Sequence, residues 1–169
     1  SMRRFLRSLL IIVAGIIIAV AALIWEGTTL ESMLDVGEVP VIDFATLERG
    51  PYANQYLLCP KSLCTAETDG EAPVFDVPVE QLQVAWDEML AEQPRLQVLR
   101  RDVTNIQIDY VQRTRLLRFP DLVTVRFVPV DDMHSTVAIY SRSVYGQGDM
   151  GVNRIRVEEW LARVKAKVG

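Results

Sequence analysis

Five polar residues with the chemistry of an anion-binding site lie close together near the end of the sequence. They are Arg142, Asp149, Asn153, Arg154 and Arg156. A glycine-rich turn that leads into a helix offers free backbone N–H groups, and arginines beside it can hold a carboxylate or a phosphate. A structural alternative stays open, in which Asp149 caps the helix and pairs with Arg142 while Asn153 fastens the turn to a sheet.

A second group of arginines forms a basic patch in an otherwise acidic chain. Its members are Arg100, Arg101, Arg113, Arg115 and Arg118. Planar guanidinium groups suit phosphate headgroups or acidic partner surfaces. A strand face exposed to solvent explains the same residues without any ligand, so both interpretations stay open.

The sequence contains no pattern typical of catalysis or of a bound cofactor. Ser141 and Ser143 lack the G-x-S-x-G context of a nucleophile, and the only histidine, His134, lies in a segment typical of a turn. Residues 146–151 match G-x-G-x-x-G, but they follow an expected antiparallel strand and do not open a βαβ unit. We therefore expect no cofactor and no enzymatic activity, with a hydrolase or isomerase that uses Asp149 as a third alternative.

Two cysteines, Cys59 and Cys64, are separated by four residues. In an oxidising compartment, such a pair favours a local disulfide. Free thiols are the alternative. Two thiolates alone do not complete a zinc site, so we expect no metal.

Residues 8–25 are 18 consecutive uncharged residues, rich in Leu, Ile, Val and Ala. As a helix they extend for roughly 27 Å, close to the ~30 Å thickness of a bilayer's hydrocarbon layer. Arg7 can snorkel at one interface, and Trp25 suits the other. The sequence therefore predicts one membrane-spanning helix, with the lipid bilayer as its partner.

The charges on either side of this run predict its orientation. Arg3, Arg4 and Arg7 precede it, and Glu26, Glu31 and Asp35 follow it. By the positive-inside rule, the N-terminus lies in the cytoplasm and the remainder on the periplasmic side of a bacterial inner membrane. A cleaved signal peptide is the alternative, because residues 19–21 resemble a cleavage site, although the apolar run continues past them.

The remaining chain is acidic. The net charge is −4, and from residue 25 onward there are 15 basic and 22 acidic residues, or −7. Nucleic acid is excluded as a partner because phosphate binding relies on an excess of Lys and Arg. We expect three parts: a basic N-terminus with its anchor over residues 1–25, a tether over 26–53, and a single extracytoplasmic domain over 54–169.

Periodicity within that domain predicts an α+β fold. Apolar residues recur at helical spacing between Asp76 and Pro94, and a last helix follows Gly151. Four segments between them show strand-like alternation or apolar runs: 95–101, 106–114, 122–130 and 136–144. Their short connections predict a four-stranded antiparallel meander, which with two helices makes a two-layer sandwich whose second face is more exposed to water.

The last strand, loop and helix resemble the uncharacterised family known as domain of unknown function 1499. The matching positions are Arg142, Ser143, Gly146, Asp149, Gly151, Val152, Asn153, Arg154 and Arg156. Residues 54–64 and 72–78 are also similar to bacterial members, so the resemblance covers roughly residues 52–167. Val144 and Tyr145 replace two small residues of the family pattern, and Pro120-Asp121 replaces an acidic pair. The resemblance implies association with a membrane and no established reaction.

These observations predict a membrane-anchored, non-catalytic accessory or scaffold protein that is held against a larger membrane-protein complex. The alternative is a binding module for a lipid or another small anionic ligand. In that case the ligand lies between the sheet and the last helix, with Arg142, Arg154 and Arg156 at the mouth of the site.

Overall fold

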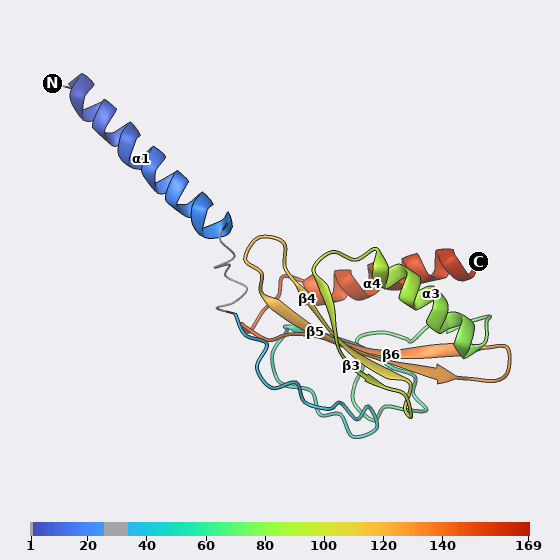
Figure 1. The fold of residues 1–169 in the computed structure, drawn as a ribbon. Helices are drawn as coiled ribbons and strands as arrows, with labels where there is room; N and C mark the ends of the chain where they lie inside the picture. Colours follow the sequence, from blue (N-terminus) through green and yellow to red (C-terminus); the bar gives the residue numbers. More distant parts are fainter. Residues whose placement is uncertain (1, 26–33) are drawn as a thin grey trace. The chain divides into compact units, whose positions relative to one another are not determined.

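The computed structural model describes residues 2–25 and 34–169, with side chains from residues 2–23 and 34–169. The chain divides into two compact units, Ser1–Asp35 and Val36–Gly169. The elements shown in Figure 1 are α1 (Met2–Trp25), β1 (Gln55–Leu58), β2 (Val74–Phe75), α3 (Val79–Ala91), β3 (Leu96–Asp102), β4 (Gln107–Arg113), β5 (Pro120–Pro129), β6 (Ser135–Ser143) and α4 (Val152–Val168).

The first unit contains the helix α1, whose apolar side chains lie on all its faces. Within it, Met2–Leu23 is long and apolar enough to cross a membrane, and none of that window is buried. A signal sequence passes the same test of length and composition, so the helix is compatible with an anchor and with a signal. The acidic residues Glu26 and Glu31, used to predict the orientation, lie outside the described residues.

The second unit is built on an antiparallel sheet in the order β1-β6-β5-β4-β3. The predicted meander of four strands is confirmed as β3 to β6, each paired with the next along the chain. Two short strands were not predicted: β1 and β2 both pair with the outer edge of β6. They have four and two residues, too few for a period-two pattern to be visible in the sequence.

Both remaining helices cover one face of this sheet (Figure 1). Trp86 of α3 and Trp160 of α4 are buried at the centre, with their ring centroids 6.2 Å apart and nearly perpendicular. Trp86 also meets Phe127 edge-on, and Trp160 meets Tyr110 in the same way. These aromatic contacts join the two helices to the middle strands and form the main core.

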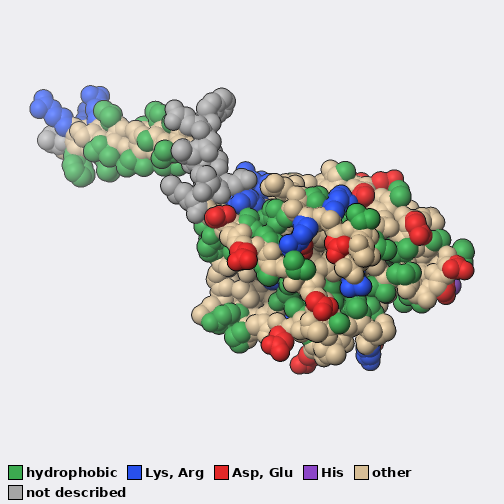
Figure 2. Space-filling model, turned by 60° about the horizontal axis from the view of Figure 1, so that its bottom comes forward, with side chains coloured by type: hydrophobic (Ala, Val, Ile, Leu, Met, Phe, Trp, Pro, Cys, Tyr) green, Lys and Arg blue, Asp and Glu red, His purple; other side chains and the backbone are tan. Residues whose placement is uncertain are grey.

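The opposite face of the sheet is also covered, contrary to the expectation of a face exposed to water. Residues 36–53 and the loop after β1 pack against it in a second apolar cluster. This cluster contains Ile42, Phe44, Leu57, Cys59, Ala138 and Tyr140. Figure 2 views the molecule from this side, where acidic and basic side chains are scattered among apolar ones. The apolar residues of this irregular segment show no period, so the sequence did not reveal that they pack on the sheet.

The predicted disulfide between Cys59 and Cys64 is present, and Cys59 lies in the second apolar cluster. Replacing both cysteines by alanine should lower the free energy of unfolding by about 2 kcal/mol, because the bond closes a short loop. Urea denaturation of the full chain in detergent measures this. Dithiothreitol should destabilise the unaltered protein equally and leave the double variant unchanged; equal stability of the two proteins would contradict the prediction.

Candidate functional site

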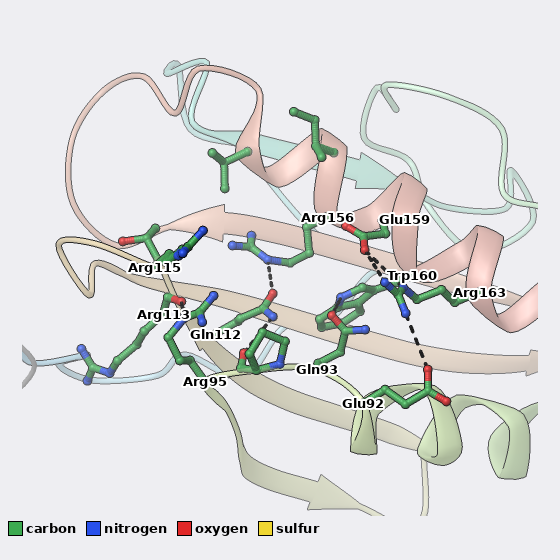
Figure 3. Close-up of a pocket in the computed structure, with 14 residues that line it drawn as sticks. Glu92, Gln93, Arg95, Gln112, Arg113, Arg115, Arg156, Glu159, Trp160 and Arg163 are labelled. Atoms are coloured by element: carbon green, nitrogen blue, oxygen red, sulfur yellow. Dashed lines mark hydrogen bonds and ion pairs between the residues drawn. The ribbon is translucent and has the colours of Figure 1, made fainter.

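A cavity of about 450 Å³ lies between α4 and the end of the β3–β4 strand pair. We call it the arginine cavity, because five arginines line it: Arg95, Arg113, Arg115, Arg156 and Arg163. Figure 3 shows Arg95, Arg115 and Arg156 around one end, and Arg163 with Glu92 and Glu159 at the other. Ile155 of α4 supplies exposed apolar surface to the cavity, and the buried Trp160 lies behind it.

The turn between α3 and β3 brings Arg95 to the cavity. Pro94 cannot continue the preceding helix, and Arg95 follows with a left-handed backbone (φ 55°). This conformation is held by two hydrogen bonds with Arg113 on β4. The Arg113 backbone N–H donates to the Arg95 carbonyl at 3.0 Å, and Arg95 Nε donates to the Arg113 carbonyl at 2.9 Å.

Arg156 forms the floor of the cavity and is fully engaged there. It donates to Asp121 Oδ2 at 2.5 Å and to Gln112 Oε1 at 2.7 Å. The side chains of Arg156 and Asp121 are only 7% and 3% exposed. The third guanidinium nitrogen of Arg156 donates to Asn153 Oδ1 at 2.9 Å and to Ser141 Oγ at 3.1 Å. This arginine therefore joins α4 to β4, β5 and β6, and its charge is neutralised by Asp121.

Asp149 and Asn153 form a hydrogen-bonded corner at the start of α4. Asp149 accepts bonds from the backbone N–H groups of Gly151 and Asn153 at 2.8 and 3.1 Å. The Asn153 side-chain amide donates to Asp149, to Ser143 Oγ and to the Asn54 carbonyl. Asp149 caps the helix and Asn153 fastens the turn to the sheet, as the structural alternative expected. The pair that this alternative expected between Asp149 and Arg142 is not formed, because Arg142 contacts Tyr140 and Thr124.

The other two arginines of the predicted site lie elsewhere. Arg142 is on the opposite sheet face, where it stacks over the Tyr140 ring at 4.8 Å and donates to Thr124 Oγ1 at 3.1 Å. Burial lowers the pKa of its guanidinium group, and its Nη2 has no hydrogen-bond partner among the described residues. Arg154 is exposed and pairs with Glu158 at 2.8 Å. The structure therefore does not bring the five predicted residues into one site.

The predicted basic patch is likewise divided between the ends of β3 and β4. Arg100 pairs with the buried carboxylate of Asp109 at 2.8 Å on the face that carries residues 36–53. Arg101 pairs with Asp87 of α3 at 3.6 Å. The three other members, Arg113, Arg115 and Arg118, lie at the far end of the hairpin, in or beside the loop between β4 and β5.

The cations of the arginine cavity differ in how far they are already neutralised. Arg163 pairs with Glu159 at 2.9 Å and with Glu92 at 3.6 Å, and Arg156 pairs with Asp121. Over the described ranges, Arg95 and Arg115 have no carboxylate within 4 Å. These two exposed arginines are the cations in the cavity best placed to receive an external anion.

Sequence reasoning missed Arg95 and Arg163. Arg163 stands seven residues after Arg156, two helical turns along the same face, so helical spacing would have found it. No local pattern marks Arg95, because only the pairing of β3 with β4 brings it to the cavity.

The cavity lies within the part of the chain that matches a known family. The family model described as "Protein of unknown function (DUF1499)" matches residues 60–164, which include β2 to β6, α3 and most of α4. The chain belongs to the DUF1499 family. Searches of curated proteins and of solved structures found no match. The resemblance expected from the last strand, loop and helix is thereby confirmed, and the arginine cavity is a feature of a DUF1499 domain.

The carboxylates around the arginine cavity all bind other groups of the domain and hold its elements together. Asp121 is bound to Arg156, Asp149 to the start of α4, and Glu92 and Glu159 to Arg163. Across residues 2–25 and 34–169, no group of three or more His, Cys, Asp or Glu side chains is arranged to hold a metal ion. The arrangement offers cationic donors beside an apolar wall, which is suited to binding an anion.

Two arginines on α4 test the structural role of the buried ion pair. Arg156→Met should destabilise the DUF1499 domain by roughly 3–5 kcal/mol, because it leaves Asp121 buried without a counterion. Arg154→Met is the matched control, and it should leave stability unchanged because its pair with Glu158 is exposed. Urea denaturation followed by tryptophan fluorescence compares them, and similar stabilities for both variants would contradict this assignment.

Proposed function

We propose that this protein is a membrane-tethered, non-catalytic binding module whose DUF1499 domain holds a small anionic ligand with a phosphate group in the arginine cavity. The observation that carries the proposal is the pair Arg95 and Arg115, which line a 450 Å³ cavity and have no carboxylate partner among the described residues. Guanidinium groups bind phosphate oxygens through charge-assisted hydrogen bonds.

The volume and the lining of the cavity suit a small anionic ligand. A volume of this order suits a small ligand such as a lipid headgroup. Pro94 and Ile155 supply exposed apolar surface against which a glycerol backbone can pack. The chain from residue 25 onward has a net charge of −7, so a cationic cavity is a local exception within an acidic domain.

Binding without catalysis is favoured by the state of the titratable side chains. The carboxylates beside the cavity are hydrogen-bonded to Arg156, to Arg163 or to the start of α4. His134 lies in the turn between β5 and β6, where its Nδ1 is 2.7 Å from Asp131. A general base needs direct access to the group it deprotonates, and none of these side chains is a free base in the cavity.

The proposed location follows from α1 and the disulfide. A helix at the N-terminus whose first two turns carry three arginines ahead of an apolar run suits an uncleaved anchor with its N-terminus in the cytoplasm. A disulfide between Cys59 and Cys64 is compatible with a periplasmic domain. An accessory role beside a larger membrane protein is the second candidate function. The anchor favours it, and recovery of a stoichiometric partner from mild detergent would support it.

Removing either unpaired arginine should weaken anion binding. In the full chain, Arg95→Ser and Arg115→Ser should each raise the Kd for glycerol 3-phosphate by about tenfold, because each change removes charge-assisted hydrogen bonds. A phosphorus NMR titration in nanodiscs of zwitterionic lipid measures the Kd. Glycerol, which lacks the phosphate, should not compete.

Arg101→Ser is the matched control, since it removes the same charge from an exposed arginine that is paired with Asp87 and does not line the cavity. It should leave the Kd within twofold, a margin of about 0.4 kcal/mol. If all three variants weakened binding equally, general electrostatic attraction would replace the cavity as the explanation.

The anchor is tested by fractionation of bacteria that express the full chain. The protein should stay in the membrane after alkaline carbonate extraction, and protease added to spheroplasts should digest the DUF1499 domain. A soluble protein whose N-terminus begins just after residue 21 would identify a cleaved signal peptide. Protection from the protease would reverse the proposed orientation.

A further inference from the structure

Two loops at one end of the sheet expose a group of apolar side chains. Leu116 and Leu117 are 83% and 53% exposed in the loop between β4 and β5, and Met150 is 98% exposed in the loop before α4. Phe119 and Tyr145 join the two loops, with their ring centroids 6.3 Å apart. The backbone of Val144 also donates to the Pro120 carbonyl at 3.2 Å, so the loops form one continuous surface.

Arginines lie among these apolar residues. Arg115 and Arg118 belong to the same loop as Leu116 and Leu117, and neither has a carboxylate within 4 Å in the portion of the chain that the structure describes. We call this combination of residues 115–119 with Tyr145 and Met150 the basic-apolar end. Such a mixture is typical of surfaces that insert into the headgroup layer of an anionic membrane.

The turn between β5 and β6 is a second exposed loop that carries apolar side chains, but its charge is negative. The turn between β5 and β6 also exposes two apolar side chains, Val130 and Met133. Its charged residues are acidic, Asp131 and Asp132. Figure 1 shows that this turn and the loop between β4 and β5 lie at opposite ends of the sheet. These two loops therefore differ in charge: one carries Arg115 and Arg118, and the other carries Asp131 and Asp132.

The point where the chain enters the domain lies near the basic-apolar end. Val36, the first residue of the second unit, lines a hollow together with Ser143 and Val144, which lead directly into Tyr145. Ten residues separate it from Trp25, and a chain of that length reaches at most about 35 Å. This length leaves the basic-apolar end within reach of a membrane that holds α1.

We infer that the basic-apolar end docks on the anionic lipid surface of the membrane that holds the anchor. Leu116, Leu117 and Met150 enter the boundary between headgroups and acyl chains, and Arg118, which does not line the arginine cavity, contacts lipid phosphates. This inference rests on the anchor of the proposed function. Thr114 and Val152 line both the arginine cavity and the apolar hollow beneath the two loops, so docking brings the cavity to the level of the headgroups.

Hydrogen exchange of the full chain in nanodiscs tests this contact. In phosphatidylcholine nanodiscs with half phosphatidylglycerol, peptides covering residues 114–119 and 145–151 should exchange at least fivefold more slowly than in pure phosphatidylcholine. The turn at residues 130–134 should exchange at the same rate in both. Equal rates at the basic-apolar end, in a chain retained in both nanodiscs, would overturn the inference.

A triple variant separates docking from ligand binding. Leu116→Ser, Leu117→Ser and Met150→Ser together should remove the slowed exchange while leaving the Kd for glycerol 3-phosphate unchanged, because Arg95 and Arg115 are intact. The matched control, Val130→Ser with Met133→Ser, should retain the slowed exchange.

Three further results of these experiments would overturn the docking inference or the cavity proposal. If the triple variant kept the slowed exchange, the apolar residues would not be the contact. If the loops were protected only when a second membrane protein is present, a protein interface would replace the lipid surface. If the chain were not retained in nanodiscs at all, the anchor and the docking inference would fail together, whereas loss of glycerol 3-phosphate binding alone would remove only the cavity proposal.

Discussion

The buried ion pair between Arg156 and Asp121 determines where the C-terminal helix lies on the sheet. Two charges that are withdrawn from water must stay paired, and their remaining donors and acceptors need partners. Gln112, Ser141 and Asn153 supply those partners from two strands and from α4 itself. Because they come from separate elements, the network is satisfied in one position of the helix, and the packing of Trp160 against Tyr110 depends on that position.

The same network explains why the arginine cavity exists and which of its arginines keep an unneutralised charge that can bind an anion. α4 is held over the end of the β3–β4 pair, so Arg156 forms the floor of the space between them, and its charge is already neutralised. The rim arginines Arg95 and Arg115 come from turns that the network does not involve, and they keep their charge exposed. Structure and binding thus depend on different arginines, even where these line one cavity.

Regular alternation made the central strands predictable, and its absence concealed the rest. The four meander strands lie within two residues of the predicted ranges, whereas β1, β2 and residues 36–53 are too short or too irregular to show a period. The five residues predicted to form one anion site are not brought together, for a related reason. Arg142 alternates with Ser141 along β6, so it points away from α4, while Arg156 faces the sheet. Residues that are close in sequence were therefore placed on opposite faces, and Arg95 joined the cavity through pairing that no local pattern indicates.

The position of the arginine cavity relative to the basic-apolar end bears on which ligand it binds. The arginine cavity and the hollow beneath the basic-apolar end share Thr114 and Val152. The point where the chain enters the domain at Val36 lies on the other sheet face, beside Ser143, which also lines the hollow beneath the loops. A soluble anion would reach a cavity anywhere on the surface, so it gives no reason for this clustering. A ligand that resides in a bilayer does, because its headgroup stays within a few ångströms of the membrane surface, and only a cavity at the docked end can reach it. A lipid headgroup as the ligand of the arginine cavity is thus the form of the proposed function that the proposed docking requires.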